Sequence, residues 1–230
     1  MNGFSLKFSG IDFSGISQGF ADVPKHPSAI FAIIGLIILA VIFIKVKNIK
    51  FSTSIITNVG VALALGAVLK MVKFYQAPMG GSATLGSMVP IFIIALFYGP
   101  EIGFLTGIIF GVIDFILAPY ILHPVQVLFD YPLAFSAIGI AGYFRNKSKF
   151  TMLAGVLISI AVRFIFHFIS GLIFYGSYAP QGMSAAYYSF FYNFGYLAPD
   201  AILCLIVLAI LPLKQIFSVI NKQNISSVKN

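Results

Sequence analysis

Three ionisable side chains lie within apolar stretches of this chain, and their types suit the binding of a small polar molecule. Arg163 and His167 stand four residues apart in the apolar stretch 161–171, which places both on one face of a helix. Asp130 lies in a second apolar run at 127–133. Ionisable groups at membrane depth are costly and usually face a protein interior, where they mark a pathway or a ligand site. These three residues are therefore candidates for solute recognition.

The composition indicates that the whole chain is an integral membrane protein. Of its 230 residues, 60% are hydrophobic and 9% are charged, whereas a soluble domain carries about a quarter charged residues. The length suffices for roughly six or seven helices of ~20 residues. The single cysteine, Cys204, lies in an apolar run, which excludes a disulfide framework and predicts a buried thiol. The net charge of +8 lies in short segments between apolar runs, a pattern of membrane loops rather than of a nucleic-acid interface.

Seven apolar segments are expected to form the helices that position these groups. They lie near residues 29–46, 52–73, 86–98, 101–118, 124–144, 151–175 and 185–213. The third segment is short for a span, so we expect it to be kinked, tilted or pressed tightly against the fourth. The first 28 residues are polar and glycine-rich and lack the pattern of a signal peptide.

Lysine and arginine predict the orientation of the chain. With seven spans, three basic clusters fall on one side: Lys45, Lys47 and Lys50; Arg145, Lys147 and Lys149; Lys214, Lys222 and Lys229. The other side carries Lys7, Lys25, Lys70 and Lys73. The excess of positive charge predicts a cytoplasmic C-terminus and an external N-terminus.

Depth along the predicted helices brings five polar residues together. At 1.5 Å per residue, the outer half of the membrane would contain Asp130, Arg163, His167, Tyr188 and Asn193. Two Pro- and Gly-containing loops, 75–82 and 175–182, would lie above them, either as hinged covers or as ordinary exposed turns. This arrangement predicts a pocket that is open to the outside and captures a solute.

The acidic and basic candidates each have a functional and a structural interpretation. Asp130 would favour a cationic ligand group, or else form an internal ion pair with Arg163. Internal pairing is the favoured interpretation of Arg163. His167 would contact ligand, carry a proton or pack by hydrogen bonding. We expect Asp114 and Asp200 to form hydrogen bonds between helices.

The neutral candidates are less specific. Asn193 offers a paired donor and acceptor to a heterocycle, or a contact between helices. Four tyrosines can stack on an aromatic ligand or cover a cation, although periodicity does not separate them from lipid-facing aromatics: Tyr120, Tyr131, Tyr175 and Tyr188. Gly60-xxx-Ala64 and Ala62-xxx-Gly66 allow another helix to approach closely, in this chain or in a partner.

Several motifs are absent from the sequence. It contains no P-loop, no G-x-S-x-G or H-E-x-x-H motif, no zinc or haem spacing and no pair of matching halves. A chain that binds a solute without an energy source suggests a non-enzymatic subunit of a larger assembly. The alternatives are a self-sufficient proton-coupled permease with Asp130, Arg163 and His167 as relay, and an intramembrane enzyme that uses His167 with Asp130.

Motifs in order along residues 52–213 support the first interpretation. They are Gly80-Gly81-Ser82, Met88-Val89-Pro90-Ile91, the run 123–131, Gly139-Ile140-Ala141-Gly142, Arg163 to Gly171, 178–182, Tyr188-Ser189 and Tyr192-Asn193. In these motifs the chain resembles the ThiT family, the thiamine-specific substrate-binding (S) component of energy-coupling factor (ECF) transporters. The resemblance implies an all-α membrane protein with a six-helix bundle at 51–214. Residues 1–50 would add one extra transmembrane helix and 215–230 a cytoplasmic tail.

The resemblance also implies roles for individual residues. The ligand would be thiamine, with Asp130 and Tyr131 facing the thiazolium and Tyr188 and Asn193 holding the aminopyrimidine. Further binding positions fall on Tyr120, Arg163, His167, Gly171 and Tyr175. Gly60 and Ala64 would dock on a transmembrane coupling protein, and two separate ATPase subunits would use ATP, so the chain itself needs no cofactor. Some members have Glu at Asp130 and Trp in the binding wall, whereas this chain has no Trp.

Overall fold

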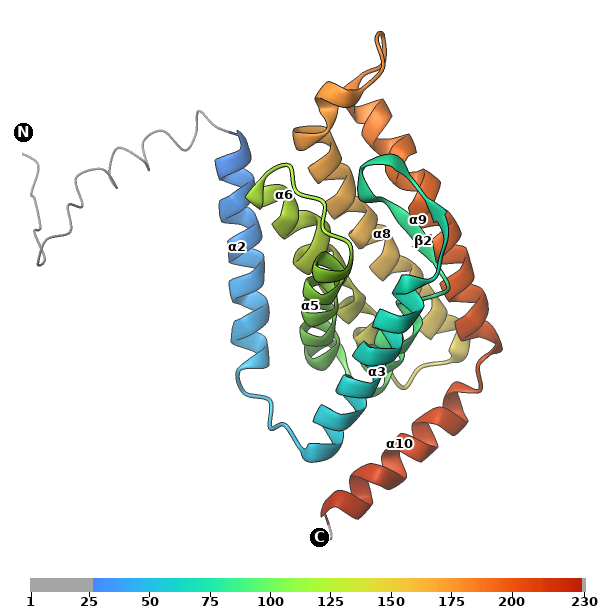
Figure 1. Cartoon of the computed structure of the whole chain (residues 1–230). Helices are drawn as coiled ribbons and strands as arrows, with labels where there is room; N and C mark the ends of the chain where they lie inside the picture. Colours follow the sequence, from blue (N-terminus) through green and yellow to red (C-terminus); the bar gives the residue numbers. More distant parts are fainter. Residues whose placement is uncertain (1–26, 229–230) are drawn as a thin grey trace, which may run out of the picture.

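The computed structural model describes residues 27–228, and the chain is a helical bundle with one small hairpin (Figure 1). The polar N-terminal segment, Lys7, Lys25 and Lys229 lie outside the described residues. Six of the described helices are long and apolar enough to cross a membrane. Together with the shorter α4 they coincide with the seven predicted segments, which confirms an all-α membrane fold.

The helices follow one another through short connections. Their bounds are α2 Pro27–Val46, α3 Thr53–Met71, α4 Val89–Tyr98, α5 Pro100–Leu117, α6 Pro124–Leu128, α7 Ala134–Ser136, α8 Lys149–Phe174, α9 Ala185–Ile210 and α10 Leu213–Val228. Shorter helical turns are η2 Pro78–Gly80, η3 Phe129–Leu133, η4 Ala137–Phe144 and η5 Gly176–Tyr178, and the two strands are β1 Lys73–Gln76 and β2 Ser82–Thr84.

The short helix α4 is pressed against α5, as one of the sequence alternatives predicted. Gly99 joins the two with φ 101°, a conformation that favours glycine. The two helices lie very close together, because a Cβ on Gly103 of α5 would lie 2.7 Å from the Ala95 side chain of α4. The main core forms where these helices meet η4, α8 and α9, and it includes Phe92, Phe110, Phe135, Val156 and Leu208.

The helix over 124–144 is irregular where it carries Asp130. An α-helical start passes into the π-helical turn η3, which contains Pro132. Proline lacks the backbone N–H of a regular helix, and π-turns are frequent at functional sites. On its other side α5 comes very close, because a Cβ on Gly111 would lie 2.5 Å from the Tyr131 carbonyl oxygen. Packing against α5 therefore fixes the position of this turn in the bundle.

Two segments form regular secondary structure that the sequence did not predict. The loop predicted at 75–82 forms most of an antiparallel β1–β2 hairpin, and Met79 at its tip has φ 60°. The segment predicted as a tail is helical, and α10 packs Phe217 against Phe97 with ring centroids 5.3 Å apart. Short strands and an amphipathic helix after a span carry little periodic signal, so the sequence did not identify them.

Basic side chains gather at one end of the bundle, where α2 joins α3, η4 joins α8 and α9 joins α10. They are all exposed: Lys45, Lys47, Lys50, Arg145, Lys147, Lys149, Lys214 and Lys222. Lys70 was assigned to the opposite side by sequence, but its side chain is buried within the bundle. The opposite side therefore has one basic residue fewer than predicted, and the difference in positive charge between the two sides, which predicts the orientation, is larger.

Candidate ligand-binding site

A pocket lies at the end of the bundle opposite the basic residues, beneath the hairpin and between α5, η3, α8 and α9. The empty space within it, together with the open space at its mouth, is about 600 Å³. All nine residues predicted as ligand contacts line it: Tyr120, Asp130, Tyr131, Arg163, His167, Gly171, Tyr175, Tyr188 and Asn193. Their contacts with a ligand remain a prediction.

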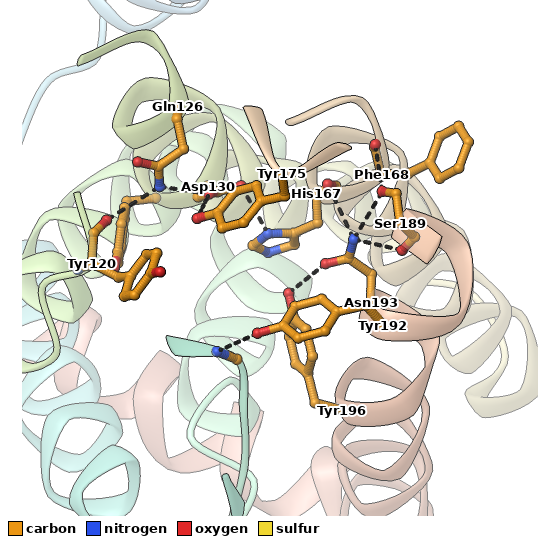
Figure 2. A network of polar contacts seen from close by, with 12 residues as sticks. Tyr120, Gln126, Asp130, His167, Phe168, Tyr175, Ser189, Tyr192, Asn193 and Tyr196 are labelled. Atoms are coloured by element: carbon orange, nitrogen blue, oxygen red, sulfur yellow. Dashed lines mark hydrogen bonds and ion pairs between the residues drawn. The ribbon is translucent and has the colours of Figure 1, made fainter. Parts of the chain in front are cut away.

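Asp130 receives hydrogen bonds from three directions (Figure 2). The Gln126 amide, one helical turn earlier, donates to Oδ2 at 2.7 Å, and the Tyr175 hydroxyl donates to the same oxygen at 3.3 Å. The His167 ring nitrogen Nδ1 lies 3.3 Å from Oδ1. None of these partners is a lysine or arginine, so the carboxylate has no permanently cationic partner among the described residues.

His167 has one ring nitrogen engaged and one available. Its side chain is buried, and the contact between Nδ1 and Asp130 favours the tautomer that carries the proton on Nδ1. Nε2 is buried and has no hydrogen-bond partner among the described residues. In that tautomer Nε2 is an acceptor. The pocket therefore offers an unused acceptor beside its carboxylate.

Arg163 pairs with Asp200, so the alternative of an Asp130–Arg163 ion pair is wrong. Its guanidinium lies 3.7 Å from Asp200 Oδ2, and its carbon lies 4.1 Å from the centroid of the Phe135 ring. Asp200 Oδ1 accepts hydrogen bonds from the backbone N–H and the hydroxyl of Thr84, both at 3.0 Å. Arg163 is thus held by internal pairing, as favoured from sequence, while Asp200 joins α9 to α8 and β2.

A second ion pair lies in the pocket lining. Lys70 Nζ on α3 lies 2.8 Å from Asp114 Oδ1 on α5, and both side chains are buried. Asp114 therefore joins two helices, as expected, although through an ion pair. Lys70 carried no sequence signal for this role because a lysine near the end of a predicted span is usually solvated.

Tyrosines form the walls of the pocket. The rings of Tyr120 and Tyr175 stack with centroids 6.0 Å apart and an interplanar angle of 20°. Burial, and then the nearby Asp130 carboxylate, raises the pKa of Tyr175 well above its usual range. Its phenol therefore remains a proton donor toward Asp130 at physiological pH. Tyr131 instead donates its hydroxyl to the Ala118 carbonyl at 2.9 Å, which anchors the loop before α6.

Asn193 and Gly171 lie where α8 and α9 cross. The Asn193 amide nitrogen donates to the Ser189 carbonyl at 2.8 Å, and its oxygen accepts from the Tyr196 hydroxyl at 2.8 Å. A Cβ on Gly171 would lie 2.2 Å from Ser189 Oγ, so only glycine permits this crossing. Both residues line the pocket, and both also hold the two helices together.

The hairpin covers the pocket through tyrosines of α9. The Tyr192 hydroxyl donates to the Pro78 carbonyl and accepts from the Gly81 N–H at 3.3 Å. A Cβ on Gly81 would lie 2.6 Å from the Tyr196 ring. The pocket is also lined by residues that were not predicted as ligand contacts: Lys70, Met79, Gly80, Gly81, Ser82, Asp114, Gln126, Ser189, Tyr192 and Tyr196. For Gln126 a signal existed, since it stands one helical turn before Asp130.

The two small-residue pairs of α3 have different environments. Ala62 and Gly66 are buried, and a Cβ on Gly66 would lie 2.9 Å from Phe110. Gly60 and Ala64 are exposed, and Gly60 has open space around its Cβ position. The first pair therefore packs within the chain, and the second is available to a lipid or protein neighbour. Among the described residues, no group of three or more His, Cys, Asp or Glu side chains is placed to hold a metal ion.

Comparisons with known proteins agree with this architecture. The family model described as "Thiamine transporter protein (Thia_YuaJ)" matches residues 56–219. The thiamine transporter ThiT of Bacillus subtilis (strain 168) is 36% identical over 169 residues, 67% of this chain and 88% of the relative. ThiT of Lacticaseibacillus paracasei is 28% identical over 140 residues, 54% of this chain and 70% of the relative.

The solved structure of ThiT from Listeria monocytogenes superposes on this chain with a TM-score of 0.62 and 26% identity, and the match covers 70% of this chain and 93% of that one. The family match spans more than half of the sequence and includes the pocket-lining helices α3, α5, α8 and α9. The chain therefore belongs to the thiamine transporter protein family, as a ThiT-type S component with one additional helix, α2.

Proposed function

We propose that this chain binds thiamine in the pocket around Asp130 and serves thiamine uptake across the cell membrane. One observation carries the proposal: of the two carboxylates that line the pocket, Asp114 is neutralised by Lys70, whereas Asp130 has only amide, phenol and imidazole partners. Asp130 is largely withdrawn from solvent, with 15% of its side chain exposed. Such a carboxylate without a cation is costly, and a ligand cation offsets that cost. The thiazolium ring of thiamine carries one permanent positive charge.

The remaining lining groups suit the rest of the molecule. The stacked rings of Tyr120 and Tyr175 offer flat faces to a heterocycle or a cation. The free Nε2 of His167 can accept a hydrogen bond from an exocyclic amino group, such as that of the aminopyrimidine. Asn193 lines the pocket and is expected to contact the aminopyrimidine.

The pocket would face outward and the energy for transport would come from elsewhere. The basic end of the bundle supports a cytoplasmic C-terminus, with the pocket at the outer side. The exposed Gly60–Ala64 pair is available to a transmembrane coupling protein that carries two ATPase subunits, as in an ECF importer. In proteoliposomes, this chain alone should then bind thiamine without accumulating it. Accumulation driven by a pH gradient would instead support the permease alternative.

Calorimetric titration of the purified full chain tests the binding proposal. Thiamine should bind at micromolar concentration or tighter, and an analogue with an uncharged thiophene ring in place of the thiazolium should bind at least about tenfold more weakly. Asp130→Asn should remove most of this preference for the cation, while Glu101→Gln, a carboxylate change on α5 outside the pocket lining, should leave it unchanged. Folded wild-type protein that gives no heat with thiamine would overturn the proposal.

A further inference from the structure

Helix α2 lies wholly outside the thiamine transporter family match, which covers residues 56–219. It lies along α5 and against α6 and η3, on the side away from the hairpin (Figure 1). Its other face is exposed, with Leu36 and Ile37 more than half accessible. One face of α2 therefore packs against α5 and against the segment that carries Asp130.

Gly35 is the point of closest approach. A Cβ at this position would lie 2.9 Å from Leu128, 3.0 Å from Leu133 and 3.1 Å from Phe129, in each case from the far end of a side chain. These three residues precede and follow Asp130 in the chain. Because Gly35 has no side chain, α2 packs directly against both ends of the π-turn.

A row of aromatic rings continues this contact behind the site. Phe31 of α2 meets Phe129 edge to face at 6.1 Å, and Phe129 meets Phe166 of α8 at 5.9 Å. Phe129 is the chain neighbour of Asp130, and Phe166 is the chain neighbour of His167. The row therefore links α2, the π-turn and α8 at the residues next to Asp130 and His167.

The π-turn depends on such support more than a regular helix would. Pro132 removes one backbone donor from it, and its wider turn is held by neighbours rather than by a continuous α-helical ladder. On one side α5 touches its backbone near Gly111. Helix α8 also packs against the turn, through Phe166 on Phe129, and α2 contacts Leu128, Phe129 and Leu133 through Gly35.

We propose that α2 is a positioning helix for the ligand carboxylate: through Gly35 and Phe31 it holds the π-turn so that Asp130 points at the bound cation. The inference rests on the proposed function, because it takes thiamine as the ligand. Ligand-site side chains bind well only when their supporting contacts keep them within about 0.5 Å of the productive position. In this chain α2 supplies such contacts to the residues on either side of Asp130.

Substitution on the two faces of α2 tests this role in the full chain. Gly35→Leu should displace the π-turn and lower the affinity for thiamine about tenfold, with less than about twofold loss for the neutral thiophene analogue. Ala40→Leu adds a side chain on the exposed face of the same helix and should change neither affinity. The comparison of the two ligands separates a change in charge placement from a general loss of structure.

The outcomes decide between the two proposals. Equal losses for both ligands, or no loss for thiamine, would overturn the positioning role while leaving thiamine binding intact. A wild-type chain that binds neither ligand would overturn the proposed function and this inference together. If Gly35→Leu does not fold, Phe31→Leu decides, because it only loosens the aromatic row. Phe31→Leu should then lower the affinity for thiamine about threefold and leave the affinity for the neutral analogue unchanged.

Discussion

Among the described residues, the two ion pairs formed by Lys70 and Arg163 and the cluster around Asp130 use an aspartate in opposite ways. Lys70–Asp114 and Arg163–Asp200 each bring one cation to one carboxylate inside the bundle. Asp130 is surrounded by hydrogen-bond donors that carry no permanent charge. The two structural carboxylates are neutralised within the chain, whereas under the proposed function the charge of Asp130 is left for the ligand to neutralise.

The two kinds of carboxylate should differ most in what they contribute to the free energy of unfolding. Asp200→Asn keeps an acceptor for Thr84 but leaves Arg163 buried without a counter-charge, so it should lower the free energy of unfolding by about 3 kcal/mol. Asp130→Asn removes the same charge from the other cluster and should cost less than about 1 kcal/mol in the absence of thiamine. Thermal unfolding in detergent, with both variants measured ligand-free, checks the difference. Equal losses would show that Asp130 too is a structural charge.

A smaller effect is expected on affinity from the second ion pair. Asp114→Asn leaves the Lys70 cation uncompensated in the pocket lining, where it repels a cationic ligand by about 1 kcal/mol, a loss of about fivefold. The double variant Lys70→Met, Asp114→Leu removes both charges and should restore the affinity. Titration of the three proteins with thiamine tests this. If the double variant stays as weak as the single one, the loss came from packing rather than from charge.

The smallest effect is expected from a donor that only supports Asp130. Tyr175→Phe removes the hydroxyl from the carboxylate but keeps the stacked ring, and Gln126 still donates at 2.7 Å. One neutral hydrogen bond contributes about 0.5–1.5 kcal/mol, so thiamine affinity should fall about threefold. Tyr178→Phe, the same change on an exposed ring, is the matched control. A loss as large as that of Asp130→Asn would make the phenol a primary ligand contact.

Much of the architecture was predictable because hydropathy along a membrane chain is a strong signal. The seven apolar segments, the short α4 and the nine lining positions followed from apolar runs, from depth counting and from family motifs. The partners of the charges did not follow. Helices with apolar residues on nearly every face do not reveal how they are rotated, so sequence could not decide whether Arg163 meets Asp130 or Asp200.

The π-turn, the hairpin and α2 illustrate the same limit. Pro132 signals an interruption in a helix, but not that the backbone widens into a π-turn there. Strands of three and four residues are too short to show an alternating pattern. The segment near 29–46 is visible as a span, yet the contact of Gly35 with the neighbours of Asp130 depends on tertiary packing alone.

The order of the two ion pairs along the chain has a consequence for how the protein is made. In each pair the cation is synthesised before its carboxylate: Lys70 on α3 precedes Asp114 on α5, and Arg163 on α8 precedes Asp200 on α9. Arg163 lies near the middle of α8, where an unpaired cation costs about 2.5–3.5 kcal/mol during insertion. Helix α8 therefore enters the bilayer at a cost in free energy, and the arrival of Asp200 on α9 during translation offsets it.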